Sequence, residues 1–335
     1  VIAHALAARV KYVRLVRRKL RGQDRFYAQL VCEGIPYCKP QHVPSPGEVG
    51  LDIGPSTVAA VGEEAAFLEV FCEEVVRKHR TIRRLQRKLD RQRRANNPDN
   101  FLPNGRVRPG PKRWNKSRRQ RRTEDALAEL FRREAAHRKT LHGTVANRLL
   151  ALGRVIKMER LSYRALQRRY GRSVSVRAPG MFVSILRRKA ASAGGRVIEF
   201  PTPFTKLSQV CHGCGNVQKK PLSQRIHACT CGITMQRDLY SAFLARCVGE
   251  DGLLHVGLAR TRWPGAEPLL RAAWSRATQP ASGRAFRPSS FGASPRSRSR
   301  SPAEEGIAQA EVPDVVAAGE SREEVAVVPL RTPRL

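Results

Sequence analysis

Four closely spaced cysteines constrain this chain more than any other feature of its sequence. Cys211 and Cys214 form one pair, and Cys229 and Cys231 form a second pair about fifteen residues later. Two pairs at this separation suit a tetrahedral zinc site, in which each pair lies on a tight turn and the thiolates point inward. The spacing therefore predicts a zinc ribbon over residues 205–236 with these four cysteines as ligands.

One detail of this block departs from the usual pattern, because a single residue separates Cys229 from Cys231. The short spacing leaves His212 and His227 as alternative ligands, although a free surface histidine is the simpler interpretation of each. A redox pair is the rival for the block as a whole, but it is expected at a strand-to-helix turn with no second pair nearby. The remaining cysteines are interpreted as small packing residues: Cys32, Cys38, Cys72 and Cys247.

The charge of the chain points to a polyanionic partner. Among 335 residues, 63 are Lys or Arg and 28 are Asp or Glu, for a formal net charge of +35. This excess is far beyond what solubility requires, and nucleic acid is the leading candidate partner. The basic excess is densest from Arg77 to Arg138, where phosphate contact is the favoured interpretation. Within it, Trp114 is either a base-stacking residue or a buried helix anchor.

No segment of the sequence reads as a membrane span or a secretory signal. The longest apolar stretches, such as Thr144–Ile156, are interrupted by polar and charged residues. The first ten residues contain His4 and Arg9 and run into a basic segment without a cleavage-site pattern. We expect a cytoplasmic, nucleoid-associated protein without a membrane partner.

The order of predicted elements favours an α/β fold. Alternating residues at 9–33 predict a β-hairpin, and a Pro-rich linker follows. The pattern then predicts strands at 48–54, 57–61, 65–71, 154–158 and 196–200, and helices at 73–94, 115–152, 181–193 and 239–248. This order fits a ribonuclease-H-like mixed sheet flanked by helices, with an inserted basic helical hairpin.

These elements divide the chain into segments. The predicted segments are a hairpin and linker over 1–47, a core over 48–204 that contains the helical insertion 73–152, the ribbon over 205–236, a last core segment over 237–250, and a mostly disordered tail over 251–335. The tail is assigned to disorder because Ser, Pro, Gly and Arg dominate it, and an acidic stretch follows.

Three carboxylates occupy unusual places in the predicted core. Asp52 lies inside an apolar strand, Glu159 ends a second strand, and Asp238 begins the last helix. Burial of an unpaired carboxylate is costly, so each needs a cation or a donor. In a ribonuclease-H-like sheet these positions converge on one edge, where two divalent ions about 4 Å apart would activate water and stabilise a leaving oxygen. Magnesium suits three hard oxygen ligands.

Each carboxylate also has an ordinary structural interpretation on its own. Asp52 could cap a turn beside Gly54, Glu159 could pair at the surface with Arg160 or Arg164, and Asp238 could be a helix N-cap. The conjunction of the three in this order is what favours a metal site.

The same residues resemble the motifs of a known family. The segments Gly50–Gly54, Ile156–Leu161, Thr205–Cys214 and Gln236–Leu239 look like the RuvC motifs and zinc ribbon of TnpB, the OrfB-type protein of insertion sequences, which is related to the type V CRISPR effectors. The resemblance covers about residues 9–248.

This resemblance implies an RNA-guided, magnesium-dependent DNA endonuclease, with DNA and a guide RNA as partners. Proteins of the family are often named transposases, although they do not move the element themselves. By motif match, Asp52, Glu159 and Asp238 take the magnesium-binding catalytic roles, and the four cysteines of the ribbon bind zinc.

The chain departs from the family pattern in two places. Family members usually carry a longer N-terminal region with most of a β-barrel and a helical recognition domain, whereas about fifty residues precede Asp52. The hairpin at 9–33 is therefore expected to be the remnant of that barrel, with the targeting apparatus missing or supplied elsewhere. In addition, Tyr240 replaces a common Asn near the third carboxylate, and we expect a modest change in the metal shell.

Two other classes of function remain open on the sequence alone. The chain could be a nucleic-acid-binding remnant that keeps the fold, the zinc and the basic face but does not cut. It could also be a basic nucleoid- or ribosome-associated zinc protein, which explains the charge and the cysteines but leaves the three carboxylates as a coincidence.

Overall fold

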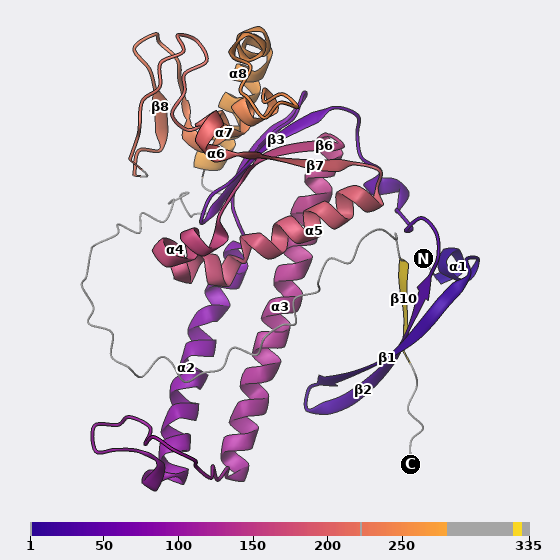
Figure 1. Ribbon diagram of the computed structural model, residues 1–335, viewed down its shortest axis with the longest axis vertical. Coiled ribbons are helices and arrows are strands. Elements are labelled where there is room, and N and C mark those ends of the chain that lie inside the picture. Colours follow the sequence, from indigo (N-terminus) through magenta and orange to yellow (C-terminus); the bar gives the residue numbers. More distant parts are fainter. Residues whose placement is uncertain (1, 222, 280–323, 330–335) are drawn as a thin grey trace. The chain divides into compact units, whose positions relative to one another are not determined.

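The computed structural model describes residues 2–221, 223–279 and 324–329 (Figure 1). These residues form two compact units. The first contains residues 2–37, 78–136 and 324–329, and the second contains 38–77 and 137–279. No helix in the described ranges has the length and apolar character needed to span a bilayer.

The first unit contains the predicted hairpin. Strands β1 (Val10–Leu20) and β2 (Gln23–Cys32) pair antiparallel, and the turn between them uses left-handed backbone at Arg21 and Gly22. A short helix, α1 (Ile2–Leu6), precedes β1. Strand β10 (Glu324–Pro329) pairs antiparallel with the other edge of β2. The hairpin prediction is confirmed, and the added strand makes a three-stranded sheet.

The predicted basic helical hairpin is also present. Helix α2 (Glu73–Asn96) and helix α3 (Arg118–Leu152) are joined by residues 97–117, and both helices contribute to both units. Within the first unit, the amide of Asn96 donates to Gln120 over 2.8 Å. The guanidinium of Arg93 lies over the ring of Trp114, 4.0 Å from its centroid. Because this contact within the protein already covers the ring, it favours a helix anchor over a base-stacking residue.

The second unit is built on a five-stranded mixed sheet, as predicted. Its strands are β3 (Glu48–Ile53), β4 (Thr57–Val61), β5 (Ala66–Val70), β6 (Val155–Arg160) and β7 (Arg196–Pro201), in the spatial order β5-β4-β3-β6-β7. Strands β3, β4 and β5 pair antiparallel with one another, in sequence order. Strands β6 and β7 run parallel to β3. Strand β3 is therefore the central strand.

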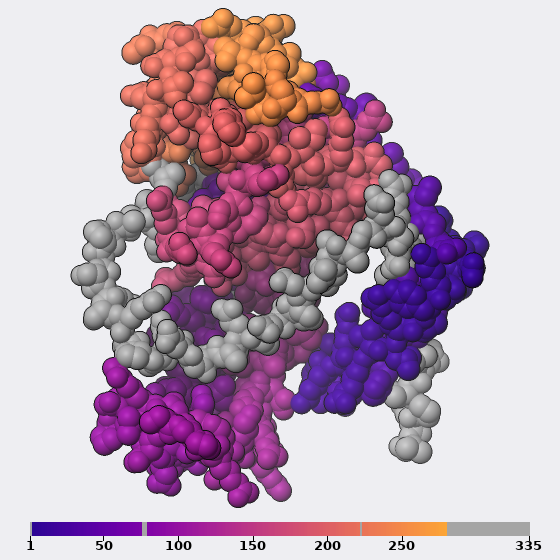
Figure 2. Space-filling model, viewed as in Figure 1, coloured from indigo at the N-terminus to yellow at the C-terminus, as the bar shows by residue number. Residues whose placement is uncertain are grey.

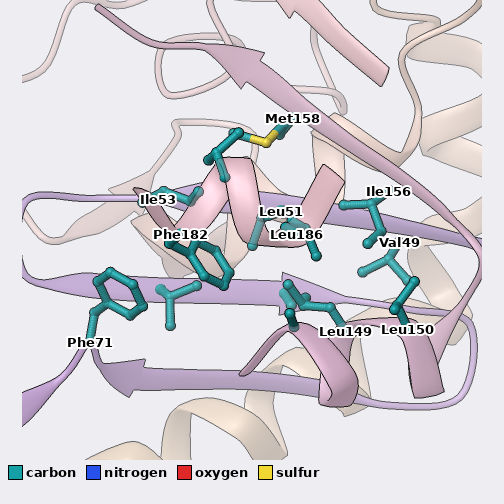
Figure 3. Packing of buried hydrophobic residues seen from close by; sticks show 14 of the residues in the cluster. Val49, Leu51, Ile53, Phe71, Leu149, Leu150, Ile156, Met158, Phe182 and Leu186 are labelled. Atoms are coloured by element: carbon teal, nitrogen blue, oxygen red, sulfur yellow. The ribbon is translucent and has the colours of Figure 1, made fainter. Parts of the chain in front are cut away.

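One face of this sheet is covered by α3 and α5 (Pro179–Ser192). Alternate side chains of β3 and β6 point to this face, because successive residues of a strand face opposite sides. Figure 3 shows the resulting apolar core. Its labelled members from the strands are Val49, Leu51, Ile53, Ile156 and Met158, and those from helices and the end of β5 are Leu149, Leu150, Phe182, Leu186 and Phe71.

The opposite face is covered by α7 (Arg237–Arg246), which packs on β3 and β4. The approach is so close that a Cβ atom added to Gly50 would lie 1.8 Å from the carbonyl oxygen of Ala242 and 2.7 Å from the backbone nitrogen of Arg246. Only glycine fits at this crossing. The position of α7, and with it the position of Asp238, therefore depends on Gly50.

Replacing Gly50 by Ala should destabilise the second unit by roughly 3 kcal/mol or more, because overpacking against backbone leaves no flexible side chain to move aside. Urea denaturation measures this change. Gly257→Ala is the matched control, since nothing lies within 4 Å of the added Cβ and the position is helical. Equal stability of the two variants would contradict the packing of α7 on β3.

The segment 251–335 was expected to be mostly disordered, and the structure corrects this for residues 256–278, which form a helix, and for residues 324–329, which form β10. Helix α8 (Val256–Thr278) packs on β5 and α7, with Ala259, Ala266, Leu270 and Ala273 buried. Its two internal prolines are exposed. The apolar stripe consists mainly of alanine, so its helical periodicity is weak in the sequence. The rest of the predicted tail, residues 280–323 and 330–335, lies outside the described residues.

A second element that the sequence analysis did not predict is α4 (Tyr163–Arg177). Its N-cap is Ser162, whose side chain accepts a hydrogen bond from the backbone of Ala165, and non-helical backbone at Tyr170 kinks it. The segment contains five arginines and only a few buried apolar residues. Its apolar stripe is therefore too short to produce a recognisable helical period.

Candidate metal centres

The four cysteines of the predicted ribbon come together in the second unit. A short two-stranded sheet, β8 (Ile226–Ala228) and β9 (Thr234–Gln236), supports them, and α6 (Thr202–Thr205) precedes the block. The Sγ atoms of Cys211 and Cys231 lie 3.5 Å apart, those of Cys214 and Cys229 lie 3.4 Å apart, and all four ligand atoms lie within 4.8 Å of one another.

This geometry fits a structural zinc ion. A tetrahedral site with Zn–S bonds of about 2.3 Å places its sulfur atoms roughly 3.8 Å apart, close to the observed separations. A hydrogen bond from the backbone of Cys231, followed by one from the thiol of Cys214, lowers the pKa of Cys229 to about 6. The fold thus already favours a thiolate at this ligand position.

Neither histidine of the block joins the cysteine group, and both are buried, so the prediction of free surface histidines is wrong. The side chain of His212 is hydrogen-bonded to the hydroxyl of Tyr240 over 2.8 Å. The ring of His227 stacks on that of Tyr240 with centroids 4.1 Å apart, and its Nδ1 lies 2.7 Å from the Nζ of Lys220. Their exposed fractions are 2% and 1%. The four-cysteine set is therefore the candidate zinc site.

The predicted place of Tyr240 beside the metal-binding carboxylates needs correction. Its hydroxyl accepts a hydrogen bond from the backbone N–H of His212 over 2.9 Å, and its ring packs within the aromatic cluster of His212, Phe243 and Trp263. Tyr240 is fully buried. It therefore fastens the ribbon to α7 and α8.

The predicted catalytic carboxylates of the two central strands lie on the α7 face of the sheet. Gly50 faces α7, so Asp52, two residues further along β3, faces the same side. On the parallel neighbour β6, Lys157 reaches the carbonyl of Val248 just after α7, over 2.8 Å, which places Glu159 on this side as well. The β3–β6 register runs to Leu51 and Met158, the residues immediately before Asp52 and Glu159.

The third carboxylate, Asp238, enters from the first turn of α7. The hydroxyl of Thr57, at the start of β4, donates to its Oδ2 over 2.9 Å. Asp238 is not the N-cap of the helix, because Gln236 fills that role and its side chain accepts from the backbone N–H of Leu239 over 2.7 Å. The capping interpretation of Asp238 therefore fails.

The other two ordinary interpretations fail as well. Asp52 lies within β3, opposite Ala59 of β4, and the turn beyond it closes through the backbone of Gly54 and Thr57. Glu159 accepts a hydrogen bond from the hydroxyl of Thr205 over 3.3 Å and is not paired with a neighbouring arginine at the surface.

The three carboxylates act on one another electrostatically. Burial raises the pKa of Asp52 well above its usual range, and the negative charges of Asp238 and Glu159 raise it further. Burial also raises the pKa of Glu159, although Thr205 and the backbone of Leu207 donate hydrogen bonds that oppose the shift. Carboxylates that repel one another and are shielded from water to this degree, with Asp238 buried and the other two half-buried, are costly without a cation.

Two arginines lie close enough to this cluster to oppose the shift. The charges of Arg237 and Arg225 lower the pKa of Asp52. Arg237 precedes Asp238 and donates to the carbonyl of Pro221 over 2.9 Å. No role could be assigned from the sequence to Arg225, Arg237, Thr57 or Thr205. Arg237 and Thr205 do lie in segments that resemble the family motifs, which was a signal for these two residues.

The two candidate centres differ in compactness. The four cysteine Sγ atoms lie close enough to one another to bind a single ion. Among the described residues, no other set of three or more His, Cys, Asp or Glu side chains does so. Asp52, Glu159 and Asp238 are not part of such a group. Their hard carboxylate oxygens are the type of ligand that magnesium takes, usually one or two per ion with several waters retained.

Comparison with known proteins bears on both candidate sites, the cysteine ribbon and the carboxylate group. No curated protein matches the chain. A family model described as Cas12f1-like, TNB domain, matches residues 180–244, which are 65 of the 335 residues. The matched segment includes α5, β7, all four ribbon cysteines and Asp238. Residues 180–244 are therefore similar to the zinc-finger domain that is typical of nucleases of the TnpB and Cas12f family.

Proposed function

We propose that the chain is an RNA-guided, divalent-metal-dependent DNA endonuclease of the TnpB type, with a RuvC-like core. One observation carries this proposal. Asp52, Glu159 and Asp238 come from three separate elements and meet on the α7 face of the sheet, where their charges raise the pKa of Asp52. A group of one buried and two half-buried carboxylates, beside a zinc domain that matches a family model, supports a metal site.

The donor set fits magnesium, since it consists of hard carboxylate oxygens. Bound at this site, magnesium would supply activation of the attacking water and stabilisation of the leaving oxygen. The side chains of the chain itself set the geometry. Thr57 orients Asp238 through its hydroxyl, and Thr205 orients Glu159.

Arg225 and Arg237 provide the positive charge at this site. Their effect on the pKa of Asp52 shows that both act on the carboxylate cluster. A phosphodiester brought to the cluster would meet these guanidinium groups, which suit the planar, bidentate recognition of phosphate. In this proposal they neutralise the substrate phosphate, while the carboxylates hold the metal.

The basic helical hairpin would bind nucleic acid outside the metal site. The segment Arg77–Arg138 spans α2, the connection 97–117 and most of α3, and its arginines far outnumber its acids. Phosphate contacts of this kind do not depend on base sequence, so they suit a guide RNA or a DNA backbone.

A cleavage assay on the purified full-length chain tests the proposal. The protein would be purified with its bound RNA, which is then sequenced, and incubated with supercoiled plasmid and single-stranded DNA in magnesium or in EDTA. We expect cleavage in magnesium that stops in EDTA, with targets that match the co-purified RNA.

Two outcomes would count against it. Binding without cleavage in either magnesium or manganese would favour a nucleic-acid-binding protein that retains the fold but not the activity. Cleavage that persists in EDTA would exclude the proposed chemistry.

A further inference from the structure

The turn that follows β7 presents an exposed aromatic ring. Phe204, in the single helical turn α6, is 71% exposed, whereas the next most exposed of the described aromatic side chains, Phe26 and Phe131, are at 45%. Helix α6 leads into the zinc ribbon, and the coral-coloured segment that contains both lies at the surface of the face shown in Figure 2. Single exposed apolar side chains are common, so the exposure of Phe204 is informative only through its place in the fold.

The neighbours of this ring in the chain hold one of the three carboxylates. Thr205 is 1% exposed, and its hydroxyl donates to Glu159 over 3.3 Å. The backbone of Leu207 donates to the same carboxylate. Because the Cα atoms of successive residues lie about 3.8 Å apart, the ring of Phe204 begins one residue from a side chain that contacts the carboxylate group. Thr205 thus faces inward to Glu159, and Phe204 faces solvent beside it.

The turn is built to keep one shape. Pro201 and Pro203 lie on either side of Thr202, and each proline ring fixes its own φ angle. At the other end, Lys206 has a φ of 46°, in the left-handed region that is costly for a residue other than glycine. Its N–H donates to the carbonyl of Thr202 over 3.2 Å, and its carbonyl accepts from the N–H of Gln209 over 2.8 Å. Strained backbone that the surrounding structure maintains is concentrated at ligand-binding sites.

The surroundings of the turn are basic. Helix α6 contains no acidic residue, and Lys206 follows it directly. Arg160 is exposed at the end of β6, where its partner in the register is Pro201, the residue before α6. The charges of Arg225 and Arg237 act on the carboxylate group. A ring among cations is the combination that binds single-stranded nucleic acid, because the cations contact phosphates and the ring stacks on a base.

We propose that Phe204 stacks on a nucleobase of the strand bound at the carboxylate group and so fixes which phosphate lies beside Glu159. This inference rests on the proposed nuclease function, which brings a strand to this site. Holding one base against a rigid turn would position the neighbouring phosphate for attack. Because every base has an aromatic face, the contact would not depend on the base sequence. Phe204 is thus a substrate-positioning residue, separate from the metal ligands.

Photochemical crosslinking locates the contact. Full-length protein, with zinc bound and no magnesium added, is irradiated with a single DNA strand that contains 5-iodouracil, a base that crosslinks to aromatic side chains in contact with it. Mass spectrometry of the peptides identifies the crosslinked residue. We expect a crosslink at Phe204 that is lost in F204L, which keeps an apolar side chain without a ring, and is retained in F204W. The matched control F26L removes another exposed ring and should leave the crosslink at Phe204 unchanged.

Competition separates stacking from proximity. An unmodified strand should suppress the crosslink at Phe204 at a concentration about 5- to 150-fold lower than an abasic strand of the same length, since one base–aromatic stack contributes a factor of this size. The melting temperature of F204L should equal that of the unmodified protein, because substitution of an exposed side chain outside the core changes stability little.

Several results would overturn the inference. They are the absence of a crosslink at Phe204, a crosslink of undiminished yield at this position in F204L, and equal competition by the abasic strand. Loss of self-association in F204L, measured by sedimentation, would also overturn it, since a second copy of the chain would then cover the ring.

The result does not depend on cleavage, because magnesium is absent. A chain that crosslinks as expected but never cuts when magnesium is supplied would refute the proposed function and leave the stacking assignment standing. A chain that cuts but forms no crosslink at Phe204 would do the reverse.

Discussion

Asp52→Asn should reduce DNA cleavage by roughly 10³-fold or more while leaving nucleic-acid binding intact. The amide keeps the shape of the side chain but removes a negative charge that would hold a divalent ion in the proposed site. Single-turnover cleavage rates at saturating magnesium measure the first effect, and anisotropy with zinc bound and no magnesium added measures the second. Asp99→Asn, outside the sheet in the connection 97–117, is the matched control and should cut normally.

The same substitution should stabilise the metal-free protein. The folded-state pKa of Asp52 is raised well above the usual 3.8, so the folded state holds a proton that the unfolded state releases. Stability of the unmodified protein should therefore fall as the pH rises from about 4 through this raised pKa. Asp52→Asn removes this loss of stability, so the difference in melting temperature between variant and unmodified protein, measured with zinc bound and no magnesium added, should grow with pH.

An inactive variant that is also more stable is the signature of a group kept for function. Full cleavage by Asp52→Asn would exclude the carboxylate cluster as the catalytic site. A lower melting temperature of this variant at neutral pH, with zinc bound and no magnesium added, would contradict the electrostatic strain inferred for the cluster.

Removal of zinc should abolish cleavage even when magnesium is saturating. Zinc binding contributes about 10–16 kcal/mol to the folding of small zinc domains, so the ribbon should unfold without it. Strand β9 runs directly into α7, and Tyr240 joins the ribbon to that helix through His212. Loss of the ribbon would therefore release the helix that carries Asp238.

Chelation, followed by readdition of zinc, tests this coupling. We expect one zinc per chain by mass spectrometry, loss of cleavage on chelation, and recovery on readdition. Trp263 reports the change by fluorescence, since its ring lies 4.6 Å from that of His212. Cys211→Ser should behave as the chelated protein, whereas Cys38→Ser, outside the cluster, should behave as the unmodified one. Unchanged cleavage by zinc-free protein would refute the coupling.

Features set by local sequence were the predictable part of this fold. The strand around Asp52, the hairpin at 9–33 and the paired cysteines carry strong local patterns, and the structure has a central strand, a hairpin and a thiol cluster at these places. The assignment of Asp52, Glu159 and Asp238 as catalytic metal ligands stays a prediction, because their roles depend on an ion and a substrate.

Features set by long-range contacts could not be predicted. Thr57 and Asp238 are 181 residues apart in sequence, and nothing local to Thr57 indicates its hydrogen bond to that carboxylate. The burial of His227, in β8, depends on the ring of Tyr240 in α7. Helix α8 was missed because alanines form its buried stripe and prolines lie on its exposed side.

A manganese-soaked crystal of the full-length protein tests the central claim most directly. Manganese occupies magnesium sites and is located by anomalous scattering, and zinc provides an internal reference in the same crystal. The account predicts manganese bound by oxygens of Asp52, Glu159 and Asp238, apart from a zinc peak among Cys211, Cys214, Cys229 and Cys231. A clear zinc peak with no manganese at the three carboxylates would contradict it.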